Sequence, residues 1–246
     1  MKRRKFVTLL AGAPIAGSAG YLATSVSSAQ GRNDGVTVSS RPVQATGAAT
    51  PVPAIDTSNA ALLVMDYQLA WIATLSDSDA LLDRAAQAIA IARTHGVPVA
   101  YCRVAFTSAD YAAVPQGNLI FTQLASKPGA LDEDAPEMAI DDRVAPEPGD
   151  KVVRKTRVGV FARTDLDEWL RSSGIDTLIL AGISTSGVVL STVCDAADRD
   201  YRLIVLADAC ADTDPEIQDV LMTKVFPQRA RVITVAELPE LLEPTS

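Results

Sequence analysis

Hydrophobic residues gather in short runs between residues 59 and 234, and segments of helical periodicity separate these runs. Most of the runs contain few polar residues, as is typical of parallel strands buried on both faces. Two shorter runs predict further strands, the last of them at an edge of the sheet. The predicted strands are 59–65, 97–104, 151–154, 177–181, 202–207 and 230–234.

Apolar residues recur every three or four positions in the intervening segments, which predicts amphipathic helices. The clearest helix is 78–95, with Gly96 after it as a C-terminal stop. The others are 164–172, 188–199, 215–225 and a terminal turn at 235–242. Because helices alternate with strands, we predict an α/β fold: a three-layer α/β/α sandwich around a mostly parallel, doubly wound sheet.

Composition divides the chain into three segments. Residues 1–29 begin with the basic group 2–5, which includes twin arginines, and continue with an Ala/Gly/Leu-rich stretch. This order predicts a twin-arginine export signal, hence a periplasmic or secreted protein with no stable membrane span after signal removal; an uncleaved amphiphilic anchor is the alternative. Residues 30–53 are rich in Gly, Ser, Thr and Pro, which predicts a flexible linker. The folded domain is expected at 54–246.

The net charge of the chain is −8, and because residues 1–29 hold four basic and no acidic residues, the remainder carries −12. An acidic body argues against nucleic acid as a partner. A single histidine, His95, excludes most His-built metal sites, and we expect neither a metal nor a cofactor. The three cysteines, Cys102, Cys194 and Cys210, form no CxxC pair and leave the disulfide state open.

The stretch 177–210 holds the strongest chemical signal. Its apolar run ends at Gly182, a small, hydroxyl-rich turn follows at 183–187, and a helix and another strand complete a β–turn–α–β unit. In an open parallel sheet, ligands bind beyond the carboxyl ends of the strands, where such a turn lies. We therefore expect the reactive end of this unit at 184–188.

Asp66 ends the first predicted strand, in the sequence ALLVMDYQ. A carboxylate there faces the same crevice, and low-dielectric surroundings would raise its proton affinity, as suits a general acid or base. The other interpretation is an aspartate whose side chain caps the following turn. The residues alone leave these two interpretations equal.

These features resemble the isochorismatase-like hydrolases, a superfamily that includes nicotinamidases and other cysteine hydrolases. The active-site turn of that family reads strand–Gly–apolar–small–Thr–x–x–Cys, and residues 182–185 match its first part, as Asp208-Ala209 match the end of the later strand. The resemblance covers roughly residues 55–240, the whole expected domain, and implies a Rossmann-like three-layer fold.

Two polar landmarks follow the same resemblance. Asp-x-Gln after the first strand implies a catalytic Asp66 with Gln68 as a supporting group. A lysine followed six residues later by Phe, and then by Thr-x-Leu, is kept here as Lys155, Phe161, Thr164 and Leu166. An ammonium beside Asp66 would hold the carboxylate and stabilise developing negative charge, so we expect Lys155 to be catalytic. The nearby Lys151, Arg154 and Arg157 are expected to be solvated or structural.

Val188 holds the position of the family's nucleophilic cysteine. A valine offers no nucleophile, and three explanations compete. The enzyme needs none, as in true isochorismatases, where the aspartate acts on a proton or on water. A hydroxyl at 184–186 replaces the thiol, which is disfavoured because the only histidine, His95, lies at a helix end far from the turn. Or the chain is an inactive relative or a binding protein.

The resemblance also implies residues around the turn. The peptide after Ile183 is expected to be cis, and Ser184, Gly187 and Val188 are expected to form the oxyanion-binding turn. From strand ends and the segment 106–149, we expect the substrate pocket to include Gln68, Trp71, Arg103, Asn118 and Phe161. Arg103 favours an anionic substrate, because a guanidinium pairs with a carboxylate.

Together the patterns predict an exported isochorismatase-like hydrolase acting on a small carboxylated enol ether or amide by Asp/Lys acid–base catalysis, without a cysteine nucleophile. The alternative is a catalytically silent ligand-binding or scaffold relative. The resemblance implies a homo-oligomer of unspecified size. Segment 106–149 is too long for simple slack and is expected to form a functional lid or insertion. Cys194, with apolar neighbours, is expected in the core.

Overall fold

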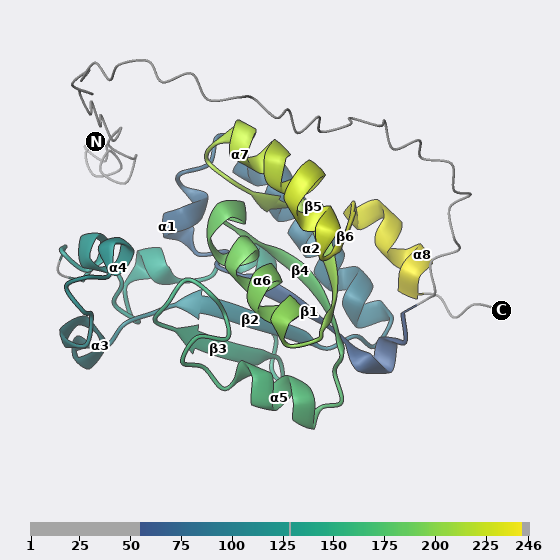
Figure 1. The fold of residues 1–246 in the computed structure, drawn as a ribbon, viewed down its shortest axis with the longest axis horizontal. Helices are drawn as coiled ribbons and strands as arrows, with labels where there is room; N and C mark the ends of the chain where they lie inside the picture. The colour runs from purple at the N-terminus through teal and green to yellow at the C-terminus, as the bar shows by residue number, and fades with distance from the viewer. Residues whose placement is uncertain (1–54, 128, 243–246) are drawn as a thin grey trace, which may run out of the picture. The chain divides into compact units, whose positions relative to one another are not determined.

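Six parallel strands form one sheet, in the order β3-β2-β1-β4-β5-β6, in a computed structural model that describes residues 55–127 and 129–242 (Figure 1). The strands are β1 Ala60–Met65, β2 Val99–Val104, β3 Lys151–Lys155, β4 Thr177–Ile183, β5 Arg202–Ala211 and β6 Arg231–Ile233. Winding proceeds from β1 through β2 to β3 on one side and from β4 to β6 on the other. A doubly wound sheet has its ligand crevice where the winding reverses, between β1 and β4.

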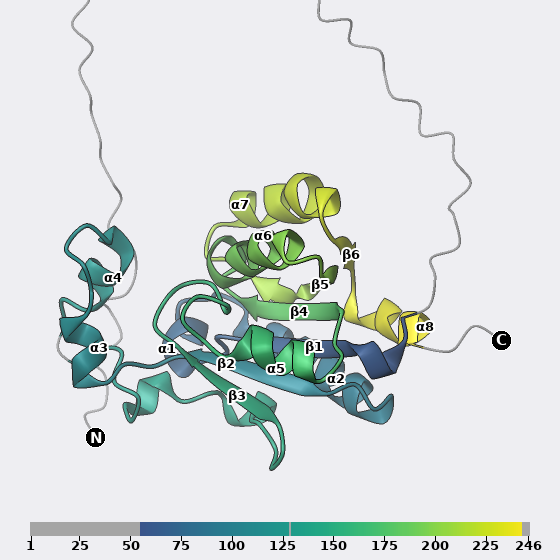
Figure 2. The same cartoon turned by 60° about the horizontal axis from the view of Figure 1, so that its bottom comes forward.

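Helices cover both faces of this sheet (Figures 1 and 2). The α-helices are α1 Leu69–Ile72, α2 Ser78–Thr94, α3 Ser108–Ala112, α4 Leu119–Leu124, α5 Leu166–Ser172, α6 Leu190–Asp198, α7 Pro215–Val220 and α8 Leu238–Leu242. One core layer includes α2 and α8, and the other includes α5, α6 and the helical turn after α7. The predicted three-layer α/β fold is confirmed.

The alternation of side chains along β1 explains the two core layers. Leu62 and Val64 pack on the layer of α2, whereas Leu63 and Met65 pack on the layer of α5 and α6. All six residues of β1 are buried, so the strand reads as a continuous apolar run. Each leucine, valine or methionine side chain of β1 contributes about 2 kcal/mol through burial.

The helix after β4 and the strand after it differ from the sequence prediction. The helix begins with a π-helical turn over Thr185–Val189 before α6, and β5 continues to Ala211 because the pairing with β4 shifts register beyond Leu180. Cys194 is exposed on α6, so its expected place in the core is wrong. The buried stripe of α6 contains Val193 and Ala196 instead, and Cys194, which lies between them, faces outward.

Segment 106–149 has a small core of its own. Buried residues from this segment and from the end of β2 pack together, and they are Val104, Phe106, Phe121, Leu131 and Met138. The Phe106 and Phe121 rings stack with their centroids 5.7 Å apart. Helices α3 and α4 lie beyond the sheet, apart from the helices that cover its faces (Figures 1 and 2). A function as a lid stays a prediction.

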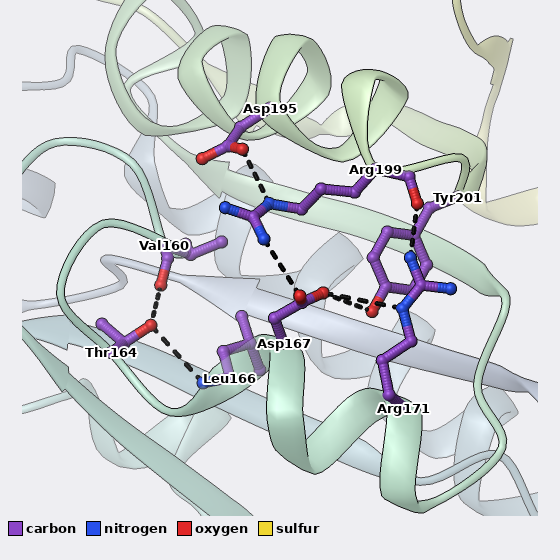
Figure 3. A network of polar contacts seen from close by, with 8 residues as sticks. All are labelled: Val160, Thr164, Leu166, Asp167, Arg171, Asp195, Arg199 and Tyr201. Carbon is purple, nitrogen blue, oxygen red and sulfur yellow. Dashed lines mark hydrogen bonds and ion pairs between the residues drawn. The ribbon is translucent and has the colours of Figure 1, made fainter.

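A polar network joins α5 to α6 and to the start of β5 (Figure 3). Asp167 accepts hydrogen bonds from Arg199 Nη1 at 2.9 Å and from the Tyr201 hydroxyl at 2.8 Å. Arg199 also pairs with Asp195 at 2.7 Å. Arg199 and Asp167 are 35% and 36% exposed. At this exposure each ion pair contributes below about 1 kcal/mol, but together they orient α5 against α6.

The predicted export signal, 1–29, and the predicted linker, 30–53, lie outside the described residues, so both stay predictions. Among the residues that the structure describes, no helix has both the length and the apolar character needed to cross a membrane. At the start of the described domain, the Ile55 amide donates to the Leu241 carbonyl at 2.8 Å. This bond fastens the beginning of the domain to α8.

Candidate active site

Asp66 lies directly after β1, at the edge where the parallel strands end. Its backbone adopts a left-handed conformation with φ of 59°, which aspartate tolerates better than most residues. Its amide donates to the Cys102 carbonyl at 2.8 Å, so the chain leaves the sheet only after this residue. The carboxylate is thereby held at the carboxyl ends of the central strands, where the sequence predicts it.

Lys155 ends β3, and its side chain reaches Asp66 across the end of β2. The Nζ atom lies 2.7 Å from Asp66 Oδ2, and the two side chains are 1% and 7% exposed. The ammonium also donates to the carbonyls of Arg157 at 3.2 Å and Val158 at 3.0 Å. All three of its donors are therefore engaged, as a buried ammonium requires. The structure brings the two residues together, while their catalytic roles stay predictions.

The carboxyl group of Asp66 is electrostatically unusual. Burial raises the pKa of Asp66, and the opposing attraction of Lys155 does not cancel this shift. Oδ2 pairs with Lys155, whereas Oδ1 is buried with no hydrogen-bond partner among the described residues. Such an orphaned atom costs about 1–3 kcal/mol, and catalytic use is one reason that proteins retain one. The geometry suits a carboxyl group that exchanges a proton at Oδ1.

Gln68 clamps the chain around this pair. Its Nε2 donates to the carbonyls of Val104 at 2.8 Å and Met138 at 2.7 Å, and its Oε1 accepts from the Val104 amide at 2.8 Å. Both amide hydrogens are used, so Gln68 has no donor left for a substrate. Its expected place in the wall of the substrate pocket is therefore corrected to a supporting one, which ties the end of β2 to segment 106–149.

The turn after β4 lies close to the end of β1. The peptide bond between Ile183 and Ser184 is cis, as the resemblance implies. A Cβ atom on Gly182 would lie 3.1 Å from atoms of both Met65 and Val189. Only glycine allows this approach without displacement of a neighbour. The glycine of the predicted motif therefore brings the turn and β1 together.

The predicted nucleophile position lies in the π-helical turn after β4. Val188 is 2% exposed and packs in the core layer of α5 and α6, so this position offers hydrocarbon and no nucleophilic atom. Gly187 precedes it, and a Cβ there would come 2.6 Å from the hydroxyl oxygen of Ser184. The turn is thus tightly folded, and its role in oxyanion binding stays a prediction.

No histidine serves the hydroxyls of this turn. His95 ends α2, where its Nδ1 atom lies 2.9 Å from the Ile91 carbonyl. That helix end leads into β2 and lies at the opposite edge of the sheet from Asp66. The Thr185 hydroxyl is buried and has no partner within the described chain. Nucleophilic attack by a hydroxyl therefore lacks a histidine base.

Three other residues predicted in the pocket lie at different elements of the fold, and their contact with a substrate stays a prediction. Trp71 lies on α1, and its indole N–H donates to Gln68 Oε1 at 3.4 Å. Asn118 caps α4, because its side-chain oxygen accepts from the Phe121 amide at 3.2 Å. Arg103 donates to the Glu133 carbonyl, and its Nε atom is buried without a partner among the described residues.

Phe161 is also predicted to line the substrate pocket, but its ring packs elsewhere. Its ring is 6% exposed and stacks on the ring of Tyr201 with centroids 6.0 Å apart. The Arg199 guanidinium lies 4.9 Å from the centroid of the same ring. Phe161 therefore packs at the junction of α5 and α6, against Tyr201 and Arg199, and not in a pocket wall. Phe161 keeps the family spacing from Lys155, but apolar packing decides where its ring points.

Arg157 is a residue that sequence reasoning missed. Its guanidinium lies 5.4 Å from the centroid of the Phe121 ring, and its Nη1 donates to the Thr156 carbonyl. Its Nη2 is buried without a hydrogen-bond partner among the described residues. Burial, and then repulsion by Arg163, lower the pKa of Arg157. No signal in the sequence separates it from the solvated cations on either side.

The three cysteines form no disulfide and offer no thiolate at the site. Cys102 and Cys210 are buried, and burial raises the pKa of each thiol to about 12. For Cys102 the negative charge of Asp66 adds to the shift. A neutral buried thiol is a poor nucleophile and a poor metal ligand. Within residues 55–127 and 129–242, no group of three or more His, Cys, Asp or Glu could hold a metal ion.

A hollow of about 740 Å³ lies beside α3, away from the Asp66–Lys155 pair. It is lined by Phe106, Tyr111 and several acidic residues of the 129–135 stretch, and neither Asp66 nor Lys155 contributes to its lining. The pair itself is covered, because the carbonyls of Arg157 and Val158 lie on the ammonium. Asp66 Oδ1 is buried as well.

Comparison with known proteins agrees with this geometry. Residues 60–237 match the isochorismatase domain. The chain is 34% identical over 214 residues to the ureidoacrylate amidohydrolase RutB of Methylobacterium radiotolerans, which covers 76% of this chain and 78% of the relative. It is 33% identical over 187 residues to the phenazine biosynthesis protein PhzD of Pseudomonas fluorescens, which covers 75% and 86%.

The solved structures give the same answer. An isochorismatase family protein from Burkholderia thailandensis superposes with a TM-score of 0.66 at 25% identity, over 77% of this chain and 98% of that one. The resemblance inferred from the turn at 182–185 and from Asp66 and Lys155 is thereby confirmed at the level of the family. The chain belongs to the isochorismatase family.

Proposed function

We propose that this protein is a hydrolase of a small carboxylated substrate, in which Asp66 is the acid–base catalyst and Lys155 its electrostatic partner, with no cysteine nucleophile. The observation that carries the proposal is the buried ion pair at 2.7 Å, in which Asp66 Oδ1 has no partner among the described residues. Family membership and similarity to a named amidohydrolase support hydrolysis of a small molecule. Val188 at the nucleophile-equivalent position supports a mechanism without a covalent intermediate.

An enol ether suits this pair best. The protonated Oδ1 of Asp66 gives its proton to the terminal vinyl carbon, and the electrons of the double bond form the new C–H bond, which leaves an oxocarbenium cation. Water adds to the cationic carbon, and its surplus proton returns to Asp66. The hemiketal then releases the alcohol, and an enolpyruvyl ether yields pyruvate. Lys155 holds Oδ2 throughout. The raised pKa of Asp66 supports this order, because the carboxyl group must start protonated.

An amide requires the opposite starting state. Asp66 would begin as a carboxylate, take a proton from water as the water attacks the carbonyl carbon, and pass that proton to the leaving nitrogen, which departs as ammonia. The ammonium of Lys155 would stabilise the developing negative charge. The upward direction of the Asp66 pKa shift, which burial causes, favours the enol-ether route over the amide route.

A catalytically silent relative is the second candidate. The observations that favour it are the buried hydrocarbon of Val188 and the cover over Asp66 and Lys155, which are 5% and 1% exposed. Such a protein binds its ligand without turnover, and its ligand binding is indifferent to Lys155→Ala.

Product release separates these functions. The purified chain is assayed for pyruvate from isochorismate and related enolpyruvyl ethers, and for ammonia from ureidoacrylate and other small amides. We expect pyruvate release that Asp66→Asn abolishes and that Asp165→Asn, at an exposed aspartate paired with Lys151, leaves unchanged. Turnover retained by Asp66→Asn would refute the catalytic role. Ammonia release that depends on Asp66 would select the amide route, and silence on every substrate would select the binding protein.

We also propose that residues 1–29 direct export by the twin-arginine route and that the mature protein is a homo-oligomer. The basic group 2–5 with its twin arginines supports export. Replacement of Arg3 and Arg4 by lysine should retain the protein in the cytoplasm of the producing cell, and unchanged delivery would exclude this route. Sedimentation velocity tests the assembly, and a monomer at micromolar concentration would refute it.

A further inference from the structure

The guanidinium of Arg157 is partly buried, and no anionic side chain among the described residues pairs with it. One side of its guanidinium is held by the Thr156 carbonyl and by the Phe121 ring, whereas Nη2 is buried with no partner among the described residues. The charge of Asp110 reaches Arg157, but that carboxylate is already paired with Arg154 at 2.6 Å. A buried N–H of a charged group without an acceptor is costly unless a ligand supplies one.

The loop of Arg157 lies against the candidate catalytic pair. Lys155 Nζ donates to the carbonyls of Arg157 and Val158, so the loop folds over the ammonium that holds Asp66. The same loop approaches the turn after β4, because a Cβ on Gly187 would lie 3.9 Å from Val158 Cγ1. The loop of Arg157 therefore contacts the buried pair, the turn after β4 and, through the Phe121 ring, α4.

The charges around Arg157 favour an anion. Burial, and then repulsion by Arg163 from the same loop, lower the pKa of Arg157, and the guanidinium stays charged at neutral pH. An anion bound here would relieve the repulsion and accept from Nη2. A carboxylate fits best among small groups, because its two oxygens match neighbouring N–H groups of a planar guanidinium.

The sequence predicts that Arg103 binds the anionic group of a substrate, but its side chain lies on the other face of β2 from the Asp66–Lys155 pair, whereas the loop of Arg157 contacts that pair. Side chains alternate along a strand, so Arg103 lies on the opposite face of β2 from Cys102. The charges of both Asp66 and Lys155 act on Cys102, which places their pair on the Cys102 side. Arg103 instead binds the Glu133 carbonyl, beside the hollow next to α3.

We infer that Arg157 binds the carboxylate of the substrate and thereby selects carboxylated molecules over neutral ones of the same shape. This inference rests on the proposed function, since it names the group that recognises the substrate of that site. It needs no turnover to be tested, because binding and hydrolysis are measured separately.

Calorimetry on the full chain compares two carboxylates with their neutral primary amides: 3-ureidopropionate with 3-ureidopropionamide, and benzoate with benzamide. The variants are Arg157→Gln, Arg157→Lys and Arg103→Gln. Arg171→Gln is the matched control, because Arg171 also stacks on an aromatic ring, that of Tyr201, and donates to a backbone carbonyl. Circular dichroism and thermal unfolding establish that each variant is folded.

We expect the wild type to prefer at least one carboxylate to its amide, and Arg157→Gln to weaken binding of that carboxylate by roughly 10- to 150-fold while it leaves the amide unchanged. Arg157→Lys should restore part of the loss, because it keeps the charge without the planar fork. Arg103→Gln and Arg171→Gln should bind like the wild type. If Arg157→Gln does not fold, the same loss of preference must appear as a smaller step in Arg157→Lys.

Three results would overturn the inference: a wild type that binds neither carboxylate, a preference that survives in Arg157→Gln, or a loss of equal size for carboxylate and amide. Failure of the proposed function looks different. A protein that binds carboxylates through Arg157 but hydrolyses no substrate keeps this inference and loses catalysis. Hydrolysis by a protein in which Arg157 is indifferent keeps the catalysis and loses this inference.

Discussion

Replacement of Lys155 by Met tests the central interaction of the site. Methionine is unbranched and only one atom shorter than lysine, but it removes the ion pair at 2.7 Å and the two bonds to the carbonyls of Arg157 and Val158. At a pH where Asp66 is ionised, the carboxylate is then buried without a counter-charge, so we expect the free energy of unfolding to fall there by about 3–5 kcal/mol.

Lys151→Met is the matched control. Lys151 lies on the same strand and pairs with Asp165 at 2.6 Å, but the two side chains are 21% and 63% exposed. Exposed pairs of this kind contribute about 0–1 kcal/mol, so the same substitution at nearly the same distance should cost little. The two lysines differ in burial and in the two bonds that Lys155 makes to carbonyls, and the comparison measures the combined effect of both.

The stability lost in Lys155→Met should depend on pH in a direction that the charges fix. Lys155 attracts the ionised form of Asp66, so its removal raises the pKa of Asp66 further above the ordinary value. As the pH falls through the range where only the variant holds a proton on folded Asp66, the stability gap between variant and wild type narrows. Urea unfolding followed by circular dichroism at several pH values measures this gap. Equal losses for the two variants, or a gap for Lys155→Met that ignores pH, would refute the reasoning.

Three further predictions follow from the same geometry. Hydrolysis of an enolpyruvyl ether should decline as the pH rises through the raised pKa of Asp66, because the acid form is consumed, and a pH–rate profile that rises instead would contradict the role of Asp66 as proton donor. Gly182→Ala should destabilise the fold by about 1–3 kcal/mol in urea unfolding, since its Cβ would meet Met65 and Val189 at 3.1 Å, whereas Gly117→Ala, with nothing within 4 Å, should be tolerated. Iodoacetamide should label only Cys194 in the native protein and all three cysteines in urea, because Cys102 and Cys210 are buried and burial raises the pKa of each to about 12. Mass spectrometry identifies the labelled residues, and labelling of either buried thiol before Cys194 would contradict the packing.

Much of the framework could be predicted from local pattern. Parallel strands buried on both faces form continuous apolar runs, so most of the six strands can be predicted from the sequence. Asp66 and Lys155 are predicted as site residues through the resemblance to the family, because the apolar pattern alone does not separate them from capping or surface residues. The motif at 182–185 also identified the family. Its glycine is required because Gly182 approaches Met65 and Val189 so closely that a Cβ would lie 3.1 Å from atoms of both residues.

Errors in the prediction arose where contacts between distant segments outweigh the local pattern. Gln68 resembles a free polar group in the sequence, yet Val104 and Met138 consume its donors. Phe161 keeps the family spacing, yet its ring stacks on Tyr201. Arg157 resembles its charged neighbours, and only its position over Phe121 shows that one of its N–H groups is buried. A sequence does not record which partner is adjacent in space.

By itself, therefore, the sequence determined the α/β class, the family, and the two charged groups of the candidate site, because hydrophobic periodicity and glycine requirements are local properties of the chain. The tertiary structure alone decided that Lys155 reaches Asp66, which oxygen of Asp66 lacks a partner, and that the buried, unpartnered Nη2 of Arg157 belongs to the loop over this pair. These properties depend on distances of a few ångströms between strands that are far apart in the chain. Burial there strengthens every charge and penalises every unmet hydrogen bond.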